Sequence, residues 1–439
     1  MLDIKLIREN PKLVLDNIEK RNDPEKVALF KTLIAADKKW RELQQSANGL
    51  RKARNDISKE IAKLKKEGKT AEAEERMKEA EAIPGQIKEV EEQAERFRLK
   101  VDDALMRVPN LLHDSVPVGK DDTENVELRR WGRQPQFDFA PKNHVEIATA
   151  LGMMDQERAA KVAGAGFVYL KGDLVLLDMA IQRFAIDFLT RKRGFTVVEP
   201  PFMIRRKPYE GVTDLSDFEM VTYKVEDERG EKNESGDLYL IATAEHPLGA
   251  MLMGEVLDKD QLPIKLCGIS PCFRKEVGTH GKYTKGLYRM HHFNKVEQFV
   301  FCLPEQSWQL HEELQKNCEA LYQALGLHYR VVNVCTGDIG SIAAKKYDTE
   351  VWMADGQFRE IGSNSNCTDY QARRLNIKFR DKPGAAPVDF VHTINNTALA
   401  TSRTMIAIME QYQQRDGSVA IPEQLVPYMG GIKKLEKRE

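Results

Sequence analysis

Two stretches of the sequence place arginines and carboxylates at spacings that suit chemistry on a phosphate. The first is Phe273-Arg274-Lys275-Glu276, followed after a Gly/Lys-rich loop by Arg289-Met290-His291-His292-Phe293-Asn294-Lys295-Val296-Glu297. The second is Asn395-Asn396-Thr397-Ala398-Leu399-Ala400-Thr401-Ser402-Arg403. The guanidinium fork binds phosphate or carboxylate bidentately and stays charged. Arg274 and Arg403, with Arg289 as a third candidate, therefore suit a reaction in which a carboxylate attacks the α-phosphate of ATP and two anions must meet.

The sequence contains neither a Walker A loop nor a GxGxxG dinucleotide loop. Gly278 and Gly281, in the loop between the two halves of the first stretch, are too sparse for either pattern. If ATP binds, side chains carried by a sheet must hold it.

The pattern of segments that would position these residues predicts an α+β fold, because the strands are too often consecutive for a doubly wound sheet. Strands are expected at 238–242, 264–270, 296–301, 329–333, 349–352 and 357–361, after a first strand in 194–202 that prolines close. Helices are expected at 179–193, 305–324 and 402–414. A mostly antiparallel sheet flanked by helices fits this order best.

The N-terminal part has a different composition and predicts an antiparallel coiled-coil hairpin. Apolar residues step by four and three along two segments, separated by the break at 66–70. The first seam is Leu43, Ala47, Leu50, Ile57, Ile61 and Leu64, and the second is Ile83, Ile87, Val90, Ala94, Phe97, Val101 and Ala104. Pro84-Gly85 interrupts the second segment, where we expect a kink or a local break.

Charge is uneven along this arm. Residues 51–70 include eight basic and three acidic residues, whereas 71–95 include three basic and nine acidic ones. On its own this is the pattern of a solvated coiled coil, but it is also that of an arm that contacts phosphates. The candidate phosphate contacts are Arg51, Lys52, Arg54, Lys59, Lys63, Lys65 and Lys66, with Lys69 at the tip.

Bulk composition narrows the classes of protein. At 439 residues and 41% hydrophobic content the chain predicts two or three domains, and its net charge of -1 gives no global signal for nucleic acid. The six cysteines form no CxxC pair, so reduced thiols and no zinc site are expected. The sequence has no signal-like N-terminus and no apolar run long enough to cross a bilayer, so we expect a soluble, cytoplasmic protein with no membrane partner.

The two stretches resemble motifs 2 and 3 of class II aminoacyl-tRNA synthetases, in the form found in seryl-tRNA synthetases. The resemblance implies that Arg274 binds the α-phosphate, Phe293 stacks on adenine and Glu276 reads its amino group. Arg403 would contact the γ-phosphate. The whole implied ATP site is Arg274, Lys275, Glu276, Arg289, Phe293, Glu360, Ile361, Gly362, Ser363 and Arg403.

A further match is Glu360-Ile361-Gly362-Ser363, which is similar to the family's magnesium-binding Glu-Ile-Ser-Ser stretch. A carboxylate and a hydroxyl suit a hard cation that keeps several waters, so Glu360 and Ser363 are the implied Mg²⁺ ligands. Gly362 stands where Ser is usual and Asn364 where Cys is usual, which raises a question about the packing around them.

The substrate pocket implied by the resemblance is one for L-serine. Its residues are Thr243, Ala244, Glu245, Arg274, Glu297, Asn395 and Thr397. Desolvated carboxylates such as Glu245 and Glu297 would discriminate against alanine, because loss of the substrate hydroxyl leaves a buried acceptor unpaired. Asn396 replaces the usual Gly, and its side chain would either narrow the pocket or point away.

The resemblance covers nearly the whole chain. It implies an N-terminal tRNA-binding domain at 1–108, with the arm at about 27–105, and a catalytic domain at 109–439. Gly194-Phe195 with Pro201 resembles motif 1, which implies a homodimer. The expected activity is formation of seryl-adenylate from serine and ATP, then transfer of serine to the 3'-terminal adenosine of tRNA(Ser), and of tRNA(Sec) where one exists. Because Cys and His clusters are lacking, the zinc-independent, bacterial-type form is expected.

Two other readings stay open at this level. Relatives of this catalytic domain that lack the arm load amino acids onto carrier proteins, and the intact hairpin argues against that class. A catalytically silent RNA-binding or scaffold protein on the same fold is the second alternative. Retention of Arg274, Glu276, Glu297, Glu360 and Arg403 argues against it.

Overall fold

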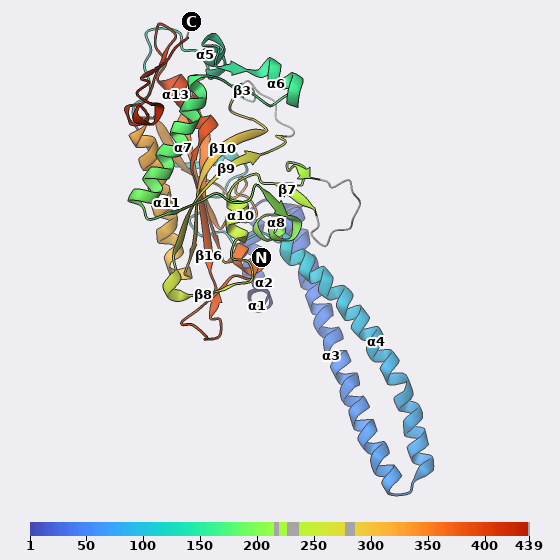
Figure 1. Cartoon of the computed structure of the whole chain (residues 1–439). Coiled ribbons are helices and arrows are strands. Elements are labelled where there is room, and N and C mark those ends of the chain that lie inside the picture. Colours follow the sequence, from blue (N-terminus) through green and yellow to red (C-terminus); the bar gives the residue numbers. More distant parts are fainter. Residues whose placement is uncertain (215–218, 226–236, 277–285, 438–439) are drawn as a thin grey trace. The chain divides into compact units, whose positions relative to one another are not determined.

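The computed structural model of the chain divides into two compact units, Met1–Pro109 and Asn110–Glu439 (Figure 1). It describes residues 1–214, 219–225, 237–276 and 286–437. The loop that contains Gly278 and Gly281 lies outside these residues. Within them, no helix has the length and apolar character that a membrane crossing needs.

The N-terminal unit is the expected helical hairpin. Two short helices, α1 (Ile4–Glu9) and α2 (Pro11–Glu19), precede the long pair α3 (Pro24–Lys66) and α4 (Thr70–Arg107) (Figure 1). Asp23 caps α3 by accepting from the backbone N–H groups of Glu25 and Lys26, and Pro24 suits the first helical position. Gly68, at φ +72°, supplies the left-handed residue of the turn between the long helices.

The two seams of the hairpin face each other as predicted. All thirteen seam residues are buried or half-buried, while the flanking positions are mostly exposed. Ion pairs cross the hairpin between Arg51 and Glu91 (2.5 Å) and between Arg76 and Glu60 (3.4 Å). Helix α4 runs unbroken through Pro84, so the local break does not occur. Burial of Ile83 and Ile87 on either side of Pro84 against α3 accounts for this, since packing of an apolar stripe supplies most helix stability.

The C-terminal unit is built on an eight-stranded sheet, which confirms the predicted fold class. In spatial order its strands are β1 (Val126–Trp131), β11 (Tyr329–Asn333), β12 (Lys345–Trp352), β13 (Phe358–Thr368), β16 (His392–Ala400), β10 (His292–Cys302), β9 (Ile264–Phe273) and β4 (Thr196–Val198). All neighbours are antiparallel except β4 and β9, which are parallel.

Smaller sheets and helices surround this sheet. The small sheets contain β2 (Met154–Asp155) with β3 (Tyr169–Leu170); β5 (Met203–Arg205), β7 (Leu238–Leu240) and β6 (Lys224–Val225); β15 (Asp389–Phe390), β14 (Lys378–Arg380) and β8 (Val256–Asp258); and β17 (Val419–Ala420) with β18 (Lys434–Leu435). The helices are α5 (His144–Ala150), α6 (Gln156–Ala163), α7 (Asp173–Lys192), α8 (Arg206–Val212), α10 (Glu245–Ala250), α11 (Ser307–Ala324), α12 (Tyr370–Leu375) and α13 (Thr401–Gln411). Short 3₁₀ helices occupy Asp122–Glu124, Lys259–Gln261, Pro304–Gln306, Glu423–Leu425 and Pro427–Met429.

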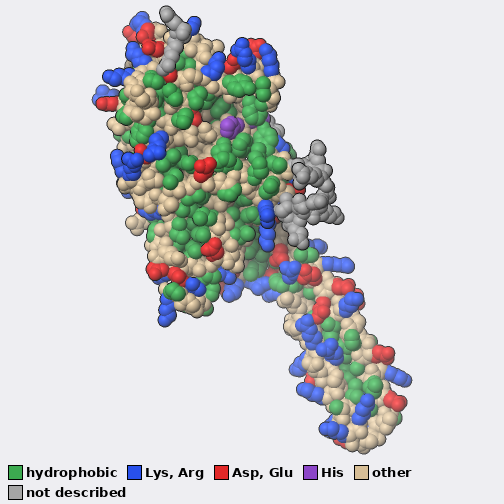
Figure 2. All heavy atoms as spheres, viewed as in Figure 1, with side chains coloured by type: hydrophobic (Ala, Val, Ile, Leu, Met, Phe, Trp, Pro, Cys, Tyr) green, Lys and Arg blue, Asp and Glu red, His purple; other side chains and the backbone are tan. Residues whose placement is uncertain are grey.

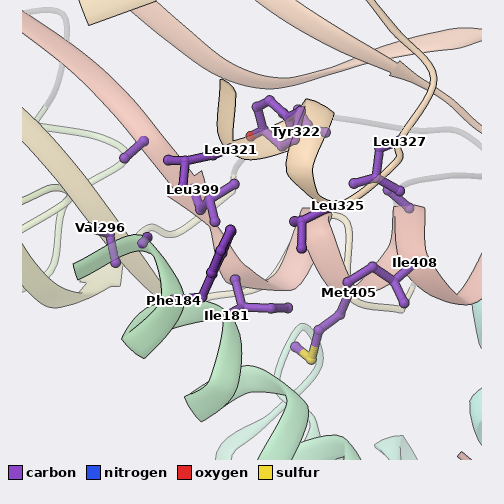
Figure 3. Packing of buried hydrophobic residues seen from close by; sticks show 14 of the residues in the cluster. Ile181, Phe184, Val296, Leu321, Tyr322, Leu325, Leu327, Leu399, Met405 and Ile408 are labelled. Carbon is purple, nitrogen blue, oxygen red and sulfur yellow. The ribbon is translucent and has the colours of Figure 1, made fainter. Parts of the chain in front are cut away.

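The two faces of the large sheet are covered by different helices. On one face α7, α11 and α13 form the main core, in which Phe184, Leu321, Leu399 and Met405 point toward one another (Figure 3). On the other face α8, α10 and α12 pack on a second cluster that includes Phe299. Because successive strand residues point to opposite faces, neighbouring residues of β10 serve the core and the polar site in turn.

A β-bulge brings polar residues of β13 onto the same face. Between β12 and β13, Asp348 pairs with Ser363 while Glu350 pairs with Glu360, so Ile361 is the extra residue. Residues opposite each other in an antiparallel pair share a face. Glu360 and Ser363 therefore lie on one face although their odd spacing would separate them in a regular strand.

A glycine on β9 allows α10 to approach the sheet. A Cβ atom at Gly268 would lie 2.6 Å from Leu248 Cδ1 and 2.9 Å from Ala244 Cβ. Gly268 pairs with Glu297 of β10, so the close approach brings the start of α10, where Glu245 lies, next to that strand.

We predict that Gly268→Ala destabilises the protein by about 1–3 kcal/mol, because the added methyl group overpacks the contact between β9 and α10. The matched control is Gly340→Ala, where a Cβ atom meets nothing within 4 Å. Urea unfolding of both variants measures the difference. Equal stability of the two variants would show that α10 does not depend on this contact.

Candidate functional site

The first carboxylate of the site is Glu245, at the start of α10. Its Oε1 accepts hydrogen bonds from Asn395 Nδ2 (3.0 Å) and Gln371 Nε2 (3.1 Å), while its backbone N–H donates to Thr243 Oγ1 (3.2 Å). Gln371 in turn accepts from Thr393 Oγ1 at 2.6 Å and donates to the Val212 carbonyl. These amide contacts, from α12 and β16, fix the position of the carboxylate.

The second carboxylate, Glu297, lies on β10 and is 1% exposed. Its Oε2 is 2.6 Å from Lys295 Nζ and accepts from Thr397 Oγ1 at 3.4 Å. Lys295 is two positions earlier on β10 and Thr397 is opposite Glu297 on β16, so all three side chains share one face. The bulge at Ala398 sets this pairing.

Each carboxylate keeps one oxygen for a ligand. Within the part of the chain that the structure describes, Oε2 of Glu245 and Oε1 of Glu297 make no hydrogen bond or ion pair. Burial and the neighbouring Glu297 raise the pKa of Glu245 to about 7, although Lys295 and Arg274 act in the opposite direction. The pocket is therefore built for a ligand that brings a positive charge.

Arg274 and Phe293 lie together at the ends of β9 and β10. The Arg274 guanidinium carbon is 5.4 Å from the Phe293 ring centroid, and Nε donates to the Ala242 carbonyl at 3.2 Å. Glu276 accepts from Arg289 Nη1 at 3.1 Å. Glu276 has φ +47°, a backbone strain of the kind that clusters at functional sites.

Arg403 and Glu360 form the other half of the site. Arg403, in the first turn of α13, donates from Nη1 to the Glu360 carbonyl (2.9 Å) and approaches Glu360 Oε1 (3.3 Å). The Tyr288 ring centroid is 4.7 Å from the Arg403 guanidinium, and the Tyr288 hydroxyl donates to the Glu360 carbonyl at 3.2 Å. Burial opposes ionisation of Glu360, but Arg403, Lys346 and Arg274 outweigh it and hold its pKa below the ordinary value.

The surroundings of Glu360 and Ser363 test whether a magnesium ion fits there. Ser363 shares its face with Glu360 and is paired with Asp348, whose buried Oδ1 has no hydrogen-bond partner in the described chain. Burial raises the pKa of Asp348 above its ordinary value, although Lys346, 3.1 Å away, acts in the opposite direction. Among the described residues, no group of three His, Cys, Asp or Glu side chains is placed to enclose a metal. An ionised carboxylate, a hydroxyl and an unpartnered oxygen suit Mg²⁺ that keeps waters and phosphate oxygens as its other ligands.

The three departures from the family pattern have structural explanations. A Cβ atom at Gly362 would lie 3.1 Å from Thr397 Cβ, so glycine lets Thr397 approach β13. Asn364 points to the face of the sheet that α11 covers, away from the polar site, and its Nδ2 donates to the His311 carbonyl at 2.9 Å. Asn396 pairs with Asn364 and with Gln298, which donates to the Leu314 carbonyl of α11. Asn396 therefore points toward α11 and away from Glu245, so it does not narrow the pocket.

The candidate arm residues form a separate, exposed set on α3. Arg51, Lys52, Arg54, Lys59, Lys63, Lys65 and Lys66 are all exposed. Arg51 pairs with Glu91, and Lys63 lies 3.9 Å from Glu67. All six cysteines are buried and form no disulfide.

Sequence reasoning missed several residues of the site. Lys295, Gln371 and Tyr288 contact predicted site residues, Asp348 lies directly opposite Ser363, and Lys346 pairs with Asp348 and helps to keep Glu360 ionised. Lys295 had a detectable signal, since it lies two positions before Glu297 in a predicted strand. Gln371 had none, because its contact with Glu245 joins segments far apart in the sequence.

Comparison with known proteins adds independent findings. Two family models match the chain: the seryl-tRNA synthetase N-terminal domain at residues 1–112, and the class II tRNA synthetase core domain (G, H, P, S and T) at residues 223–412. The serine–tRNA ligase of Methanocella arvoryzae is 57% identical over 99% of this chain and 100% of its own length. That of Methanospirillum hungatei is 53% identical over 98% and 99%. Both relatives are from archaea, whereas the lack of Cys and His clusters in the sequence predicted the bacterial-type form of the enzyme.

Two solved structures of seryl-tRNA synthetases also resemble this chain over its whole length. The seryl-tRNA synthetase of Pyrococcus horikoshii, complexed with ATP, superposes with a TM-score of 0.94 at 48% identity, covering all of both chains. The cytoplasmic serine–tRNA ligase of Naegleria fowleri, in complex with AMP, gives a TM-score of 0.87 at 37% identity, over 100% of this chain and 99% of the other.

Proposed function

Because this chain belongs to the seryl-tRNA synthetase family, whose members activate serine with ATP and charge tRNA with it, we propose which residues carry out each step. The observation that carries the proposal is the pair of buried carboxylates, Glu245 and Glu297, each with one oxygen left for a ligand beside Arg274.

Serine is a zwitterion with a hydroxyl, and the pocket offers one group for each part. Glu245, supported by Thr243 and the backbone of Ala244, binds the ammonium. Glu297 and Thr397 bind the hydroxyl, and Asn395 holds Glu245 in place. Arg274 lies on the same side and takes the carboxylate as it meets the α-phosphate.

ATP lies along the ends of β9 and β10. Phe293 stacks on adenine, Glu276 accepts from its amino group, and Lys275 and Arg289 line the phosphates, with Arg403 on the γ-phosphate. The serine carboxylate attacks the α-phosphorus and pyrophosphate leaves, so seryl-adenylate forms. The hydroxyl of the terminal adenosine of tRNA then attacks the seryl carbonyl, and AMP leaves. Arg274 and Arg403 offset the repulsion between the anions.

We further propose that Glu360 and Ser363 hold Mg²⁺, which would supply charge neutralisation at the phosphates. Ile361 and Gly362 shape the strand between these ligands, since Ile361 is the bulged residue and Gly362 makes room for Thr397. The ionised Glu360 and its shared face with Ser363 support this assignment.

A homodimer is proposed from the exposed apolar side chains at the motif 1 segment. Val175, Leu176 and Met179 on α7 and Val197 on β4 are exposed, and Figure 2 shows hydrophobic side chains gathered on the α7 side of the C-terminal unit. Exposed apolar patches of this kind mark interaction surfaces. Strand β4 is at the edge of the sheet, where a second copy of this chain would cover it.

The proposed acceptors are tRNA(Ser) and, where it exists, tRNA(Sec), bound in part by the basic stretch of α3. Its exposed Lys and Arg side chains suit shape and phosphate recognition rather than base reading. Because charged tRNA is consumed by ribosomes, we propose that the protein works in the cytoplasm.

ATP–pyrophosphate exchange with a panel of amino acids tests the activation step. We expect exchange with serine well above alanine, glycine and threonine, and Arg274→Ala should lower it by roughly 100-fold or more, because a transition-state cation is lost. Arg380→Ala, which removes an ion pair with Asp258 in a separate small sheet, is the control and should retain exchange. A preference for alanine or glycine would favour the carrier-protein class, and no exchange would favour the silent RNA-binding alternative.

The raised pKa of Glu245 predicts a pH dependence of serine binding. Below about 7 its carboxyl is protonated and offers no charge to the ammonium, so the KM for serine should fall as pH rises from 6 to 8. The steepest part approaches about tenfold per pH unit. Glu245→Gln should raise the KM by about 10- to 100-fold and flatten the profile. The KM for ATP, measured in parallel, should not follow this profile; a wild-type serine KM that is constant with pH would contradict the assignment.

The arm can be tested separately from the pocket. Replacing Lys59, Lys63, Lys65 and Lys66 together by Ala should raise the KM for tRNA(Ser) by roughly tenfold or more and weaken its salt dependence, while exchange is unchanged. Glu72→Gln with Glu74→Gln on the acidic helix is the control, since removing negative charge should not weaken tRNA binding. An unchanged KM for tRNA in the lysine variant would exclude these residues as phosphate contacts.

A further inference from the structure

We infer that Lys295 is a positioning residue of the serine pocket: it is a resident cation that compensates Glu297, so that only Glu245 is left to bind the substrate ammonium and Glu297 is kept for the hydroxyl. The inference deepens the proposed function and rests on it. None of the family motifs used above assigns a role to Lys295.

The geometry sets Lys295 apart from an ordinary surface lysine. It is 6% exposed, its Nζ is 2.6 Å from Glu297 Oε2, and both side chains leave β10 on the same face. Desolvation of an ion pair this deeply buried can cost more than the attraction returns. A surface ion pair would serve stability as well, so the burial of this one indicates a role in the pocket.

The balance of charges in the pocket explains why Lys295 is buried there. Without Lys295, two carboxylates would share one desolvated pocket and repel each other. With Lys295 paired to Glu297, the ammonium of serine meets one uncompensated carboxylate, Glu245, and the serine carboxylate meets one uncompensated cation, Arg274. Each charge of the zwitterion then has a single partner, which fixes its orientation.

The same pairing explains how the pocket tells the ammonium from the hydroxyl. Glu297 uses Oε2 for both Lys295 and Thr397, so its other oxygen points to the ligand with its charge already offset. Such an acceptor suits a neutral donor such as a hydroxyl. Without Lys295, Glu297 would compete with Glu245 for the ammonium, and serine would lose part of its advantage over alanine.

Groups from several helices and strands act on the pKa of Glu245. Glu297 raises its pKa, while Lys295 and Arg274 lower it and Gln371 donates a hydrogen bond. Tyr209 of α8 and Cys367 of β13 also face it, and both are neutral at working pH because burial raises the pKa of each. Lys295 and Arg274 are thus the cations acting on Glu245 among the described residues.

The test is the pH profile of the serine KM in Lys295→Met, which keeps the side-chain length and removes the charge. We expect the midpoint of the profile to move up by about one pH unit or more, because a nearby cation is lost. The KM for serine at pH 7 should rise by roughly tenfold or more and the preference for serine over alanine should fall, with the KM for ATP little changed.

Two further variants separate charge from packing. Lys265→Met removes another 2.6 Å Lys–Glu pair at the far end of β9 and should leave the midpoint where it is. In a Glu297→Gln background the carboxylate that pairs with Lys295 is absent. Adding Lys295→Met to this background should again move the midpoint of the serine KM profile to higher pH. The comparison of these two variants remains valid even if Lys295→Met alone folds poorly. Lys295→Arg, which keeps the charge, should hold the wild-type midpoint.

The outcomes distinguish the inference from the proposed function. If the wild type exchanges with serine but Lys295→Met raises the KM without moving the midpoint, Lys295 only packs and the inference is wrong. If the midpoint moves equally in Lys265→Met, the effect is general and the inference is also wrong. If the wild type gives no serine-dependent exchange, the proposed function fails, and the inference fails with it.

Discussion

The site depends on one electrostatic constraint, which is that two carboxylates must be held close together in a pocket largely closed to water. Glu297 is almost wholly buried, and burial together with Glu297 raises the pKa of Glu245. Neutral amides from Asn395 and Gln371 fix the position of Glu245, whereas the Lys295 cation offsets Glu297. The pocket is thus polarised before any ligand arrives, as expected where an enzyme's electrostatics are preorganised.

The sheet meets this constraint by departing from regularity. Regular strands would send Glu360 and Ser363 to opposite faces, and an ordinary side chain at position 268 would push α10 away from Glu297. The bulge at Ile361 corrects the first problem and the glycine on β9 the second, while the bulge at Ala398 pairs Glu297 with Thr397. β-Bulges are typical beside active sites for this reason, since each re-aims side chains without changing the overall sheet.

The second half of the site also depends on compensation of a buried charge. Around Glu360 the cations Arg403, Lys346 and Arg274 keep the carboxylate ionised although it is buried. Cations gathered in this way suit a triphosphate. Arg274 belongs to both halves, which is consistent with a reaction that joins a carboxylate to a phosphate.

Local periodicity in the sequence was enough to predict the hairpin, the α+β class, helices α7, α11 and α13 and seven of the strands, whereas the central strand β16 was not predicted. The seams at three and four residues predicted α3 and α4, and the strand at 329–333 was predicted with its observed bounds. It also supplied the motif residues. Three features depend on packing between segments that are distant in the sequence. Helix α4 continues through Pro84, Asn396 faces α11, and Lys295 pairs with Glu297. The physical reason is that a face or a charge partner depends on strand register and burial. A single bulge reverses the alternation that sequence spacing implies, and only packing decides which cation reaches which carboxylate.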